Sequence, residues 1–448
     1  MLTRIEIDGF KTFEGFKLDL EPFCAVVGPN ASGKSNLFDA LRFLSALSQT
    51  DIRTAMQNLR GESEELFRRT QSGEVDRMTF AIEVLLQRSV EDAFGQEVKI
   101  DAQRLRYELR IARRSGSSGG FRGVFIDFEE CSPIKKVDEN SKYIKNSKHI
   151  SYAGNKQPFI RMRENSKDEY DAIEIRQDAK RGRPITLAVA DASRSALSTI
   201  TTAEFPHLYA LKDFLASIRF LQIDPQAARR PSDRLSGREL APDASNLATV
   251  LARIQSETTT AERPQGALAD IAADLASLIT SVRGILVQDD ERSREYAFDV
   301  ELEDKLTFSS RVISDGTLRL LALLTILNDP ERKGLLCFEE PENGVHEGRI
   351  PQLVNLLRNS CTVDPGGCEE PYFQILTNTH SPAVMRSLKD NEIIAADTIT
   401  MLDPAHHQKS SKTRMRTGVK EVGDLIDPER VLTRFEIDAL LKKITEAA

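Results

Sequence analysis

The sequence predicts an α/β fold in which a core of mixed and parallel β-sheet is flanked by helices and carries an inserted, mainly helical lobe. Three observations support this prediction. Near the N-terminus, a short apolar strand leads into a glycine-rich loop and then into a helix with apolar spacing. In the last third of the chain, two more apolar strands flank a long amphipathic helix. Between these parts, residues 205–286 repeatedly show helical spacing of apolar residues.

The composition is that of a globular protein that does not engage a membrane. The chain has 448 residues, of which 40% are hydrophobic and 29% charged, enough for two or three domains or one large domain with an insertion. No apolar run approaches the ~20 residues that a membrane helix needs, and the charged, alternating N-terminus is not a signal peptide. Five scattered cysteines without a CxxC pair indicate a reducing compartment, so we expect a cytoplasmic protein.

The expected elements divide the chain into four parts. Strands are expected at residues 2–7, 14–22, 23–28, 78–88, 105–114, 295–302, 306–313, 334–340 and 373–380, and helices at residues 35–47, 205–215, 246–254, 266–286, 317–327 and 347–359. We therefore expect an N-terminal lobe with the glycine-rich loop (1–114), a polar insertion or elaborated loop (115–200), a helical lobe (201–300) and a C-terminal lobe (301–448).

The glycine-rich loop fits the pattern G-x-x-x-x-G-K-[S/T] in full between Gly28 and Ser35. Its glycines let backbone N–H groups turn toward phosphates, and the following helix adds the positive end of its dipole. We expect Lys34 to reach the β- and γ-phosphates of a nucleotide and Ser35 to ligate Mg²⁺. The residues expected to bind ATP here are Gly28, Pro29, Asn30, Ala31, Ser32, Gly33, Lys34, Ser35 and Asn36.

A second motif is the apolar strand GLLCF, which ends in Glu339 and Glu340. A phosphate-binding loop needs a partner carboxylate near the metal and a group that polarises the attacking water. We expect Glu339 to hold the Mg²⁺ shell through water and Glu340 to act on the attacking water. The alternative, a solvated strand end with incidental acids, is weakened by the continuation PENGVH.

A third motif, Ser314-Asp315-Gly316, precedes a helix expected to begin near Thr317. Ser314 or Asp315 can cap this helix, and Gly316 permits the close approach of a phosphate. Taken alone, the motif is explained better by an ordinary helix N-cap.

A fourth motif, TNTHSP, places His380 at the end of the strand FQIL. A histidine there can hydrogen-bond a γ-phosphate or the attacking water, although a lone histidine is more often structural. Its position after the acidic strand favours the functional interpretation.

The order of the four motifs distinguishes the chain from kinases and GTPases, which lack the third and fourth. With this order the chain resembles the SMC/RecF-like branch of the ABC-type AAA ATPases, and especially its OLD-like stand-alone bacterial members without a Toprim domain. The segments that carry the resemblance are IEIDGFKTF, GPNASGKSN, ISDGT, FEEPENGVH and TNTHSP, which span nearly the whole chain, with a weaker likeness in FLQIDP and DASNLATVL.

The resemblance implies an ABC-type P-loop NTPase head that uses ATP and Mg²⁺. Two heads of a homodimer, or of a higher homo-oligomer, would enclose two ATP molecules, and residues 343–346 would form the D-loop at the seam. The implied roles are catalytic base for Glu340, switch histidine for His380, metal contact for Ser35 and Glu339, and closure over the γ-phosphate of the opposite head for Ser314, Asp315 and Gly316.

Several positions depart from the family pattern or stay open. Glu339 stands where transporters carry aspartate, and Glu347 stands where the D-loop histidine is usually followed by proline. Gln222 and Gln226 are both candidates for the glutamine that contacts Mg²⁺. Arg60 is either the arginine loop that such heads direct at nucleotide or DNA, or a solvated helix end.

The net charge of −8 argues against a surface coated with basic residues, but a local patch can still bind DNA. Basic residues cluster at 180–183, 229–238 and 409–420. A charge run is more often a solvated loop than a DNA site, so double-stranded DNA stays one possible partner. Such a patch would neutralise phosphates without reading bases.

The sequence favours an ATPase that works as a switch or clamp in DNA maintenance, DNA repair or anti-phage defence. One alternative is an ATPase scaffold or sensor that oligomerises and regulates a separate nuclease of the HNH or Toprim type, because too few residues follow Pro382 for a Toprim domain of its own. A transporter ATPase subunit and a nucleotide-binding protein with little turnover are further alternatives.

Overall fold

The structure of the protein is a computed structural model. It describes the chain except residues 71–72, 93, 116–120, 142, 146, 148, 153–156, 165–169, 178–183, 190, 363–369, 404–407, 419–430, 434, 440–441 and 443–448. Its α-helices are α1 (Lys34–Leu47), α2 (Ile52–Gln57), α3 (Pro206–Ala216), α4 (Pro225–Ala228), α5 (Leu247–Thr258), α6 (Leu268–Leu278), α7 (Asp315–Leu327), α8 (Ile350–Ser360) and α9 (Pro382–Ser387). Among the residues so described, no helix is long and apolar enough to cross a membrane.

A seven-stranded sheet combines strands from both ends of the chain in the order β14-β19-β20-β3-β21-β22-β23. The first five strands of this order are parallel, and β22 returns antiparallel to β21. The strands are β14 (Arg219–Leu221), β19 (Gly334–Glu339), β20 (Phe373–Thr379), β3 (Phe23–Val27), β21 (Ile393–Asp403), β22 (Gln408–Gly418) and β23 (Val431–Leu432). Because the carboxyl ends of parallel strands meet at one edge, the loops after β14, β19, β20 and β3 converge there.

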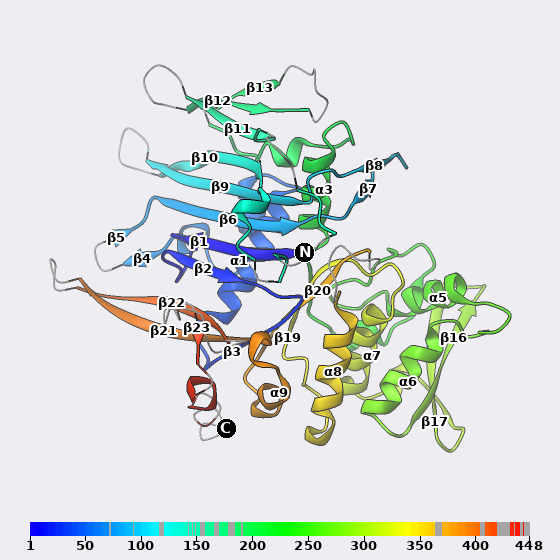
Figure 1. Cartoon of the computed structure of the whole chain (residues 1–448). Coiled ribbons are helices and arrows are strands. Elements are labelled where there is room, and N and C mark those ends of the chain that lie inside the picture. The colour runs from blue at the N-terminus through cyan, green and yellow to red at the C-terminus, as the bar shows by residue number, and fades with distance from the viewer. Residues whose placement is uncertain are drawn as a thin grey trace.

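An eight-stranded antiparallel sheet lies beside it, in the order β13-β12-β11-β10-β9-β6-β1-β2 (Figure 1). Its strands are β1 (Leu2–Asp8), β2 (Phe16–Asp19), β6 (Arg77–Leu85), β9 (Arg104–Ser115), β10 (Phe121–Pro133), β11 (Ile160–Glu164), β12 (Tyr170–Ile175) and β13 (Ile185–Ala188). One hydrophobic core joins this sheet to α1, α3 and one face of the seven-stranded sheet. The apolar spacing of α1 therefore reflects burial between two sheets, which fixes the helix that follows the glycine-rich loop.

Residues 115–200 differ from the expected polar insertion or elaborated loop. They contribute β10 to β13 to the eight-stranded sheet, and β10 pairs with β9 along most of its length. Between the polar tracts of this part are short stretches in which apolar and polar residues alternate. Their apolar residues, including Ile126, Ile160, Met162 and Ile173, are buried in the core. Such short alternation predicts a strand only weakly, because a strand is stabilised by the side chains of the neighbouring strands against which it packs.

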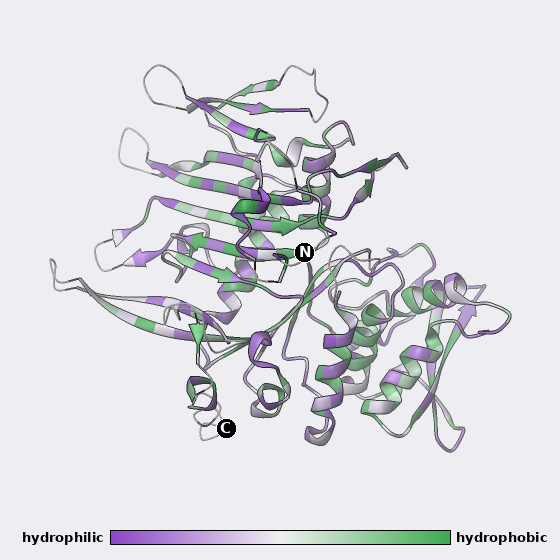
Figure 2. Ribbon diagram, viewed as in Figure 1, coloured by the Kyte–Doolittle hydropathy of each residue, from purple (hydrophilic) through white to green (hydrophobic). Residues whose placement is uncertain are grey.

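The expected helical lobe is mixed. A second core joins the other face of the seven-stranded sheet to α5, α6, α7 and α8, and Figure 2 shows hydrophobic and hydrophilic bands on these helices, as expected for helices with one buried face. A small sheet lies on the far side, formed by β15 (Ser232–Asp233), β16 (Val282–Asp290), β17 (Glu295–Leu302) and β18 (Thr307–Ser309). The helix expected to reach Leu286 ends at Leu278, because VRGILVQ pairs with β17 as a strand.

The remaining described elements are short. They are the strand pairs β4 (Arg69–Thr70) with β5 (Gly73–Glu74) and β7 (Ser89–Glu91) with β8 (Glu97–Lys99), and the 3-10 helices η1 (Ser63–Leu66), η2 (Lys136–Asp138), η3 (Leu197–Thr199), η4 (Ser310–Val312), η5 (Glu347–Arg349) and η6 (Asp390–Glu392).

Candidate active site

Three of the four sequence motifs meet at the carboxyl edge of the seven-stranded sheet. The glycine-rich loop follows β3, Glu339 ends β19, and His380 follows β20, which lies between those two strands. In the register of β14 and β19, Leu221 pairs with Phe338, so Gln222 leaves the sheet beside Glu339. The structure therefore favours Gln222 over Gln226, which lies in α4, as the glutamine at this edge.

The glycine-rich loop is closed by its own lysine. Lys34 Nζ donates to the carbonyl oxygens of Gly28 and Pro29, each at 2.7 Å. Partial burial lowers the pKa of Lys34, and the nearby carboxylates of Glu340 and Glu339 oppose that shift. The ammonium group thus lies between the loop and the two acids, where a phosphate could replace the carbonyl oxygens as its partner.

Buried polar atoms without hydrogen-bond partners show that the site fits a nucleotide with a metal ion. Ser32 is 1% exposed, and its Oγ has no hydrogen-bond partner. Glu339 Oε1 is also buried without a hydrogen bond, although Arg60 Nη2 lies 3.5 Å away. A buried oxygen without a hydrogen-bond partner destabilises the folded state, unless a ligand supplies the partner. In the described part of the chain no group of three or more His, Cys, Asp or Glu side chains that could hold a metal ion occurs.

Glu340 and His380 form a pair across the ends of adjacent strands. His380 Nδ1 lies 3.2 Å from Glu340 Oε1, and both side chains are partly exposed to solvent. Glu340 has a left-handed backbone (φ 52°), and its N–H donates to the Asn378 carbonyl at 3.0 Å. Asn343 Nδ2 donates to Glu340 Oε2 at 2.7 Å. Both carboxylate oxygens of Glu340 therefore have a fixed neighbour, which suits a general base that must face a water molecule.

Glu342 is a residue of this site that the sequence analysis did not single out. Thr379 Oγ1 donates to its Oε1 at 2.5 Å, and its Oε2 is buried without a hydrogen-bond partner. Burial raises the pKa of Glu342, in spite of the bond from Thr379. The signal in the sequence was the third acid of EEPEN, but only the pairing of β19 with β20 brings it against Thr379.

The third motif caps a helix, as its simpler interpretation predicts. Ser314 is the N-cap of α7 and accepts from the Thr317 N–H at 3.2 Å. Asp315 pairs with Arg229 Nη2 at 2.5 Å. Gly316 lies against the loop after β19: a Cβ on Gly344 would stand 2.6 Å from its Cα. The motif therefore contacts Gly344 of its own chain, in the loop that follows Glu340.

Arg60 Nη2 lies 3.5 Å from Glu339 Oε1, which favours the arginine-loop interpretation over a solvated helix end. Lys11 holds the backbone there, because its Nζ donates to the Arg60 carbonyl at 3.2 Å and pairs with Asp39 at 2.6 Å. An open hollow of about 530 Å³, lined in part by Arg42, Arg60 and Gln222, adjoins this position.

Two of the three expected basic clusters fall, wholly or in part, within the described residues. The cluster at 180–183 lies outside the described residues. The arginines of 229–238 are largely engaged within the chain: Arg229 pairs with Asp315, Arg234 with Asp289, and Arg238 with Glu257 and Glu331. The described part of 409–420 is β22, where Arg414 pairs with Asp397 and Arg416 with Glu436. These ion pairs reduce the charge that either described cluster offers to DNA.

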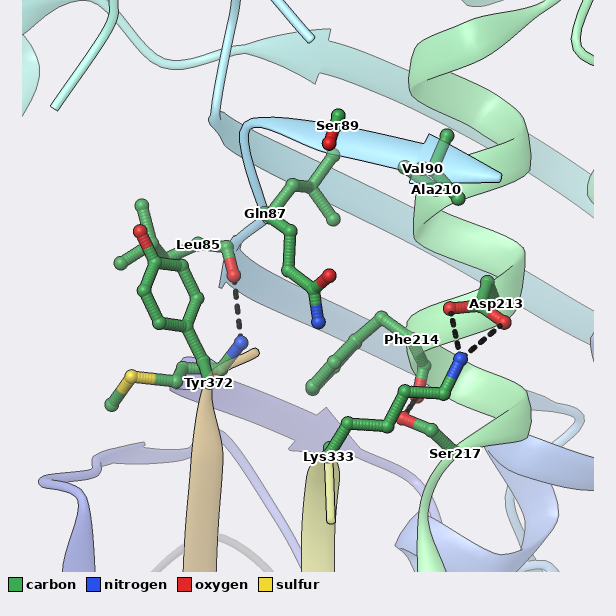
Figure 3. Close-up of a pocket in the computed structure, with 13 residues that line it drawn as sticks. Leu85, Gln87, Ser89, Val90, Ala210, Asp213, Phe214, Ser217, Lys333 and Tyr372 are labelled. Atoms are coloured by element: carbon green, nitrogen blue, oxygen red, sulfur yellow. Dashed lines mark hydrogen bonds and ion pairs between the residues drawn. The ribbon is translucent and has the colours of Figure 1, made fainter. Parts of the chain in front are cut away.

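The cavity in Figure 3 is lined by none of the residues expected to bind ATP or Mg²⁺ or to act in catalysis. It lies beside Lys333 and Gly334 at the amino end of β19, the opposite end from Glu339, and its volume of about 30 Å³ suffices for roughly one water molecule. Lys333 pairs there with Asp213 at 3.0 Å, and the groups serve the junction of α3 with the sheets.

Comparison with known proteins identifies the family and the fold. The profile of the family described as "AAA domain, putative AbiEii toxin, Type IV TA system" matches residues 23–386, from β3 to α9. The chain belongs to this family. The predicted SMC/RecF-like, ABC-type ATPase class is confirmed, and with it the expected α/β fold.

Curated relatives match over shorter stretches. "Structural maintenance of chromosomes protein 1" of Arabidopsis thaliana is 31% identical over 108 residues, which cover 22% of this chain and 9% of that protein. "Chromosome partition protein Smc" of Methanocaldococcus jannaschii is 50% identical over 44 residues, 10% of this chain and 4% of that protein. The match therefore spans less than a tenth of the length of these relatives.

Among solved structures, "Crystal structure of the SmcHead bound to the C-winged helix domain of ScpA" aligns with a TM-score of 0.50 and 16% identity. The alignment covers 93% of this chain and 97% of that chain. At this identity the likeness shows the fold, which is that of an SMC head.

Proposed function

We propose that this chain is an ATP-hydrolysing switch in which two copies close around two ATP molecules with Mg²⁺. The observation that carries the proposal is the His380–Glu340 pair, held at 3.2 Å on the same sheet edge as the loop closed by Lys34. His380 lies next to one carboxylate oxygen of Glu340, and the Asn343 amide donates to the other. This arrangement is not expected of an incidental acid at a strand end.

The residues have distinct tasks in this proposal. Lys34 exchanges the Gly28 and Pro29 carbonyls for phosphate oxygens, and Ser35 and Glu339 hold the metal ion. Mg²⁺, when bound, neutralises charge that develops on the phosphates. Glu340 accepts the proton of the attacking water, with His380 holding its orientation.

In the proposed dimer, the N-terminal end of α7, from Ser314 to Gly316, closes over the γ-phosphate of the opposite copy. Ser314 accepts from the Thr317 N–H and so fixes the first turn of α7, whose positive dipole end would face the phosphate.

The test is Glu340→Gln, with Glu303→Gln, an exposed acid of the β17–β18 turn, as matched control. We expect the Glu340 variant to lose at least about 100-fold in steady-state ATP hydrolysis, the usual size of a lost general base. It should still bind ATP and accumulate as a dimer on size exclusion, while the control behaves as wild type. Hydrolysis at the wild-type rate by Glu340→Gln would contradict the proposal.

The process served by the switch is a separate proposal. The names of the SMC relatives support DNA maintenance, and the toxin in the family description supports a defence system, the setting in which a separate nuclease partner is also expected. Salt-dependent binding of duplex DNA in a gel shift would favour the first. Protection of a host from phage by wild type but not by Lys34→Ala, without DNA binding, would favour the second.

A further inference from the structure

The β21–β22 hairpin forms the surface on which the glycine-rich loop rests. β21 pairs with β3 up to Ala395–Val27, so its next residue lies beside the start of the loop. A Cβ on Gly28 would stand 2.3 Å from the carbonyl oxygen of Ala396 on β21, and a Cβ on Gly33 would stand 2.1 Å from Thr413 Oγ1 on β22. Both glycine ends of the loop are therefore in direct contact with the two strands of one hairpin.

A short chain of hydrogen bonds between side chains connects β22 to the first turn of α1. Asn36 Nδ2 donates to Thr12 Oγ1 at 2.8 Å, and the Oγ1 atoms of Thr12 and Thr413 are 2.7 Å apart. The backbones are joined as well, because the Thr413 N–H donates to the Thr12 carbonyl at 3.0 Å. Thr413 is only 4% exposed, so its hydroxyl has little water to replace these partners.

The hairpin continues beyond the sheet. Only Ile393, Ile394 and Ala395 of β21 pair with β3, whereas the β21–β22 pairing runs on to Asp403 and Gln408. Figure 1 shows this outer part as a long arm that leaves the body of the molecule. Thr413 lies between the arm and the loop, since it pairs with Thr398 across the hairpin.

We propose that Thr413, acting through Thr12, is a positioning residue for the phosphate-binding loop. Its hydroxyl fixes Thr12, and Thr12 fixes Asn36. The backbone N–H groups between Gly33 and Asn36 are thereby held in the conformation that accepts phosphate before the nucleotide arrives. This inference rests on the proposed ATP-binding function.

The test removes the hydroxyl and keeps the shape. Thr413→Val is compared with Thr413→Ser, which retains the hydroxyl, and with Thr398→Val, the cross-strand neighbour, which is exposed. We expect Thr413→Val to raise the Kd and KM for ATP about fivefold, the size of one lost neutral hydrogen bond, with kcat within about twofold. Thr413→Ser and Thr398→Val should stay near wild type.

A second measurement does not depend on activity. Amide hydrogen exchange of the peptide spanning residues 28–37, without nucleotide, should become about fivefold faster in Thr413→Val, because the loop opens locally more often. A Thr12→Val, Thr413→Val double variant should show no larger change than Thr12→Val alone, since both substitutions break one chain of bonds.

The outcomes separate this inference from the proposed function. Unchanged Kd and unchanged exchange in Thr413→Val would overturn the positioning role, as would additive effects in the double variant. A Thr413→Ser variant as impaired as Thr413→Val would also overturn it, because the effect would then come from packing. If wild type binds ATP no better than Lys34→Ala, the proposed function fails, and the exchange measurement still decides the role of Thr413.

Discussion

His380 Nδ1 lies 3.2 Å from Glu340 Oε1, although the two residues are 40 positions apart in the chain. Parallel pairing of β19 with β20 places Glu339 opposite Asn378. The residues that follow in both strands therefore leave the sheet at the same edge. The left-handed backbone of Glu340 then turns its carboxylate toward the histidine. The geometry of the proposed catalytic pair is thus set by strand register and one unusual backbone conformation.

Asn343→Ala should impair turnover more than nucleotide binding. Asn343 Nδ2 donates to Glu340 Oε2, so its loss frees the carboxylate of the proposed base to rotate. We expect kcat for ATP hydrolysis to fall about tenfold while KM stays within about twofold, as for a group that positions a base. Asn355→Ala, an exposed position on α8, is the control. Equal kcat in wild type and Asn343→Ala would show that Glu340 needs no such support.

Gly344→Ala should uncouple ATP binding from hydrolysis. A Cβ at this position would stand 2.6 Å from the Gly316 Cα, and its φ of 91° is strained for any side chain. The loop after Glu340 or the start of α7 must therefore move. We expect ATP binding near wild type and hydrolysis at least about tenfold lower, because such misplacement affects the reaction more than binding. Gly348→Ala, where the added Cβ meets only ordinary contacts, should hydrolyse ATP normally.

Glu342→Gln should change how stability depends on pH. Burial raises the pKa of Glu342 above its usual 4.5, so the folded chain binds this proton more tightly than the unfolded chain. The contribution of Glu342 to stability is therefore full below the unfolded pKa and is lost as pH rises through the folded pKa. The glutamine stays neutral, so the variant should gain stability relative to wild type in thermal melts as the pH rises above the usual glutamate pKa of 4.5. A difference that is constant with pH would rule out this titration.

Arg104→Met should destabilise the eight-stranded sheet. Arg104 is fully buried, pairs with Glu139 at 2.6 Å, lies 3.5 Å from Glu83 and donates to Thr3 Oγ1 at 2.9 Å. Removing the guanidinium leaves buried carboxylates without a counter-charge, which typically costs about 3–5 kcal/mol of unfolding free energy. Arg106→Met, whose side chain is one-third exposed, should cost less than about 1 kcal/mol. Urea denaturation measures both, and equal losses would contradict the special role of burial.

Several features could be read from the residues alone because their signals are local. A strand, a G-x-x-x-x-G-K-S loop and an apolar helix are adjacent in sequence, so β3, the loop and α1 follow directly from spacing. The strand GLLCF and its two acids, and the strand FQIL with the histidine after it, are equally local. The order of these motifs was sufficient for the family and the fold class.

Contacts between distant segments were not readable in this way. The strands β10 to β13 give only short alternation, and their place depends on pairing with β9. Likewise, the choice of Gln222 over Gln226 depends on the register of β14 against β19. The approach of the Arg60 guanidinium to Glu339 depends on how α2 packs.

The sequence by itself predicted which chemical groups this protein would bring to a nucleotide: Lys34, Ser35, the two acids and His380. Only the tertiary structure decided which of them touch, because strand register and loop conformation, rather than residue type, set distances of a few ångströms. The contact of Thr413 with Gly33 is the clearest case, since the two positions are 380 residues apart and meet only through the hairpin beside β3.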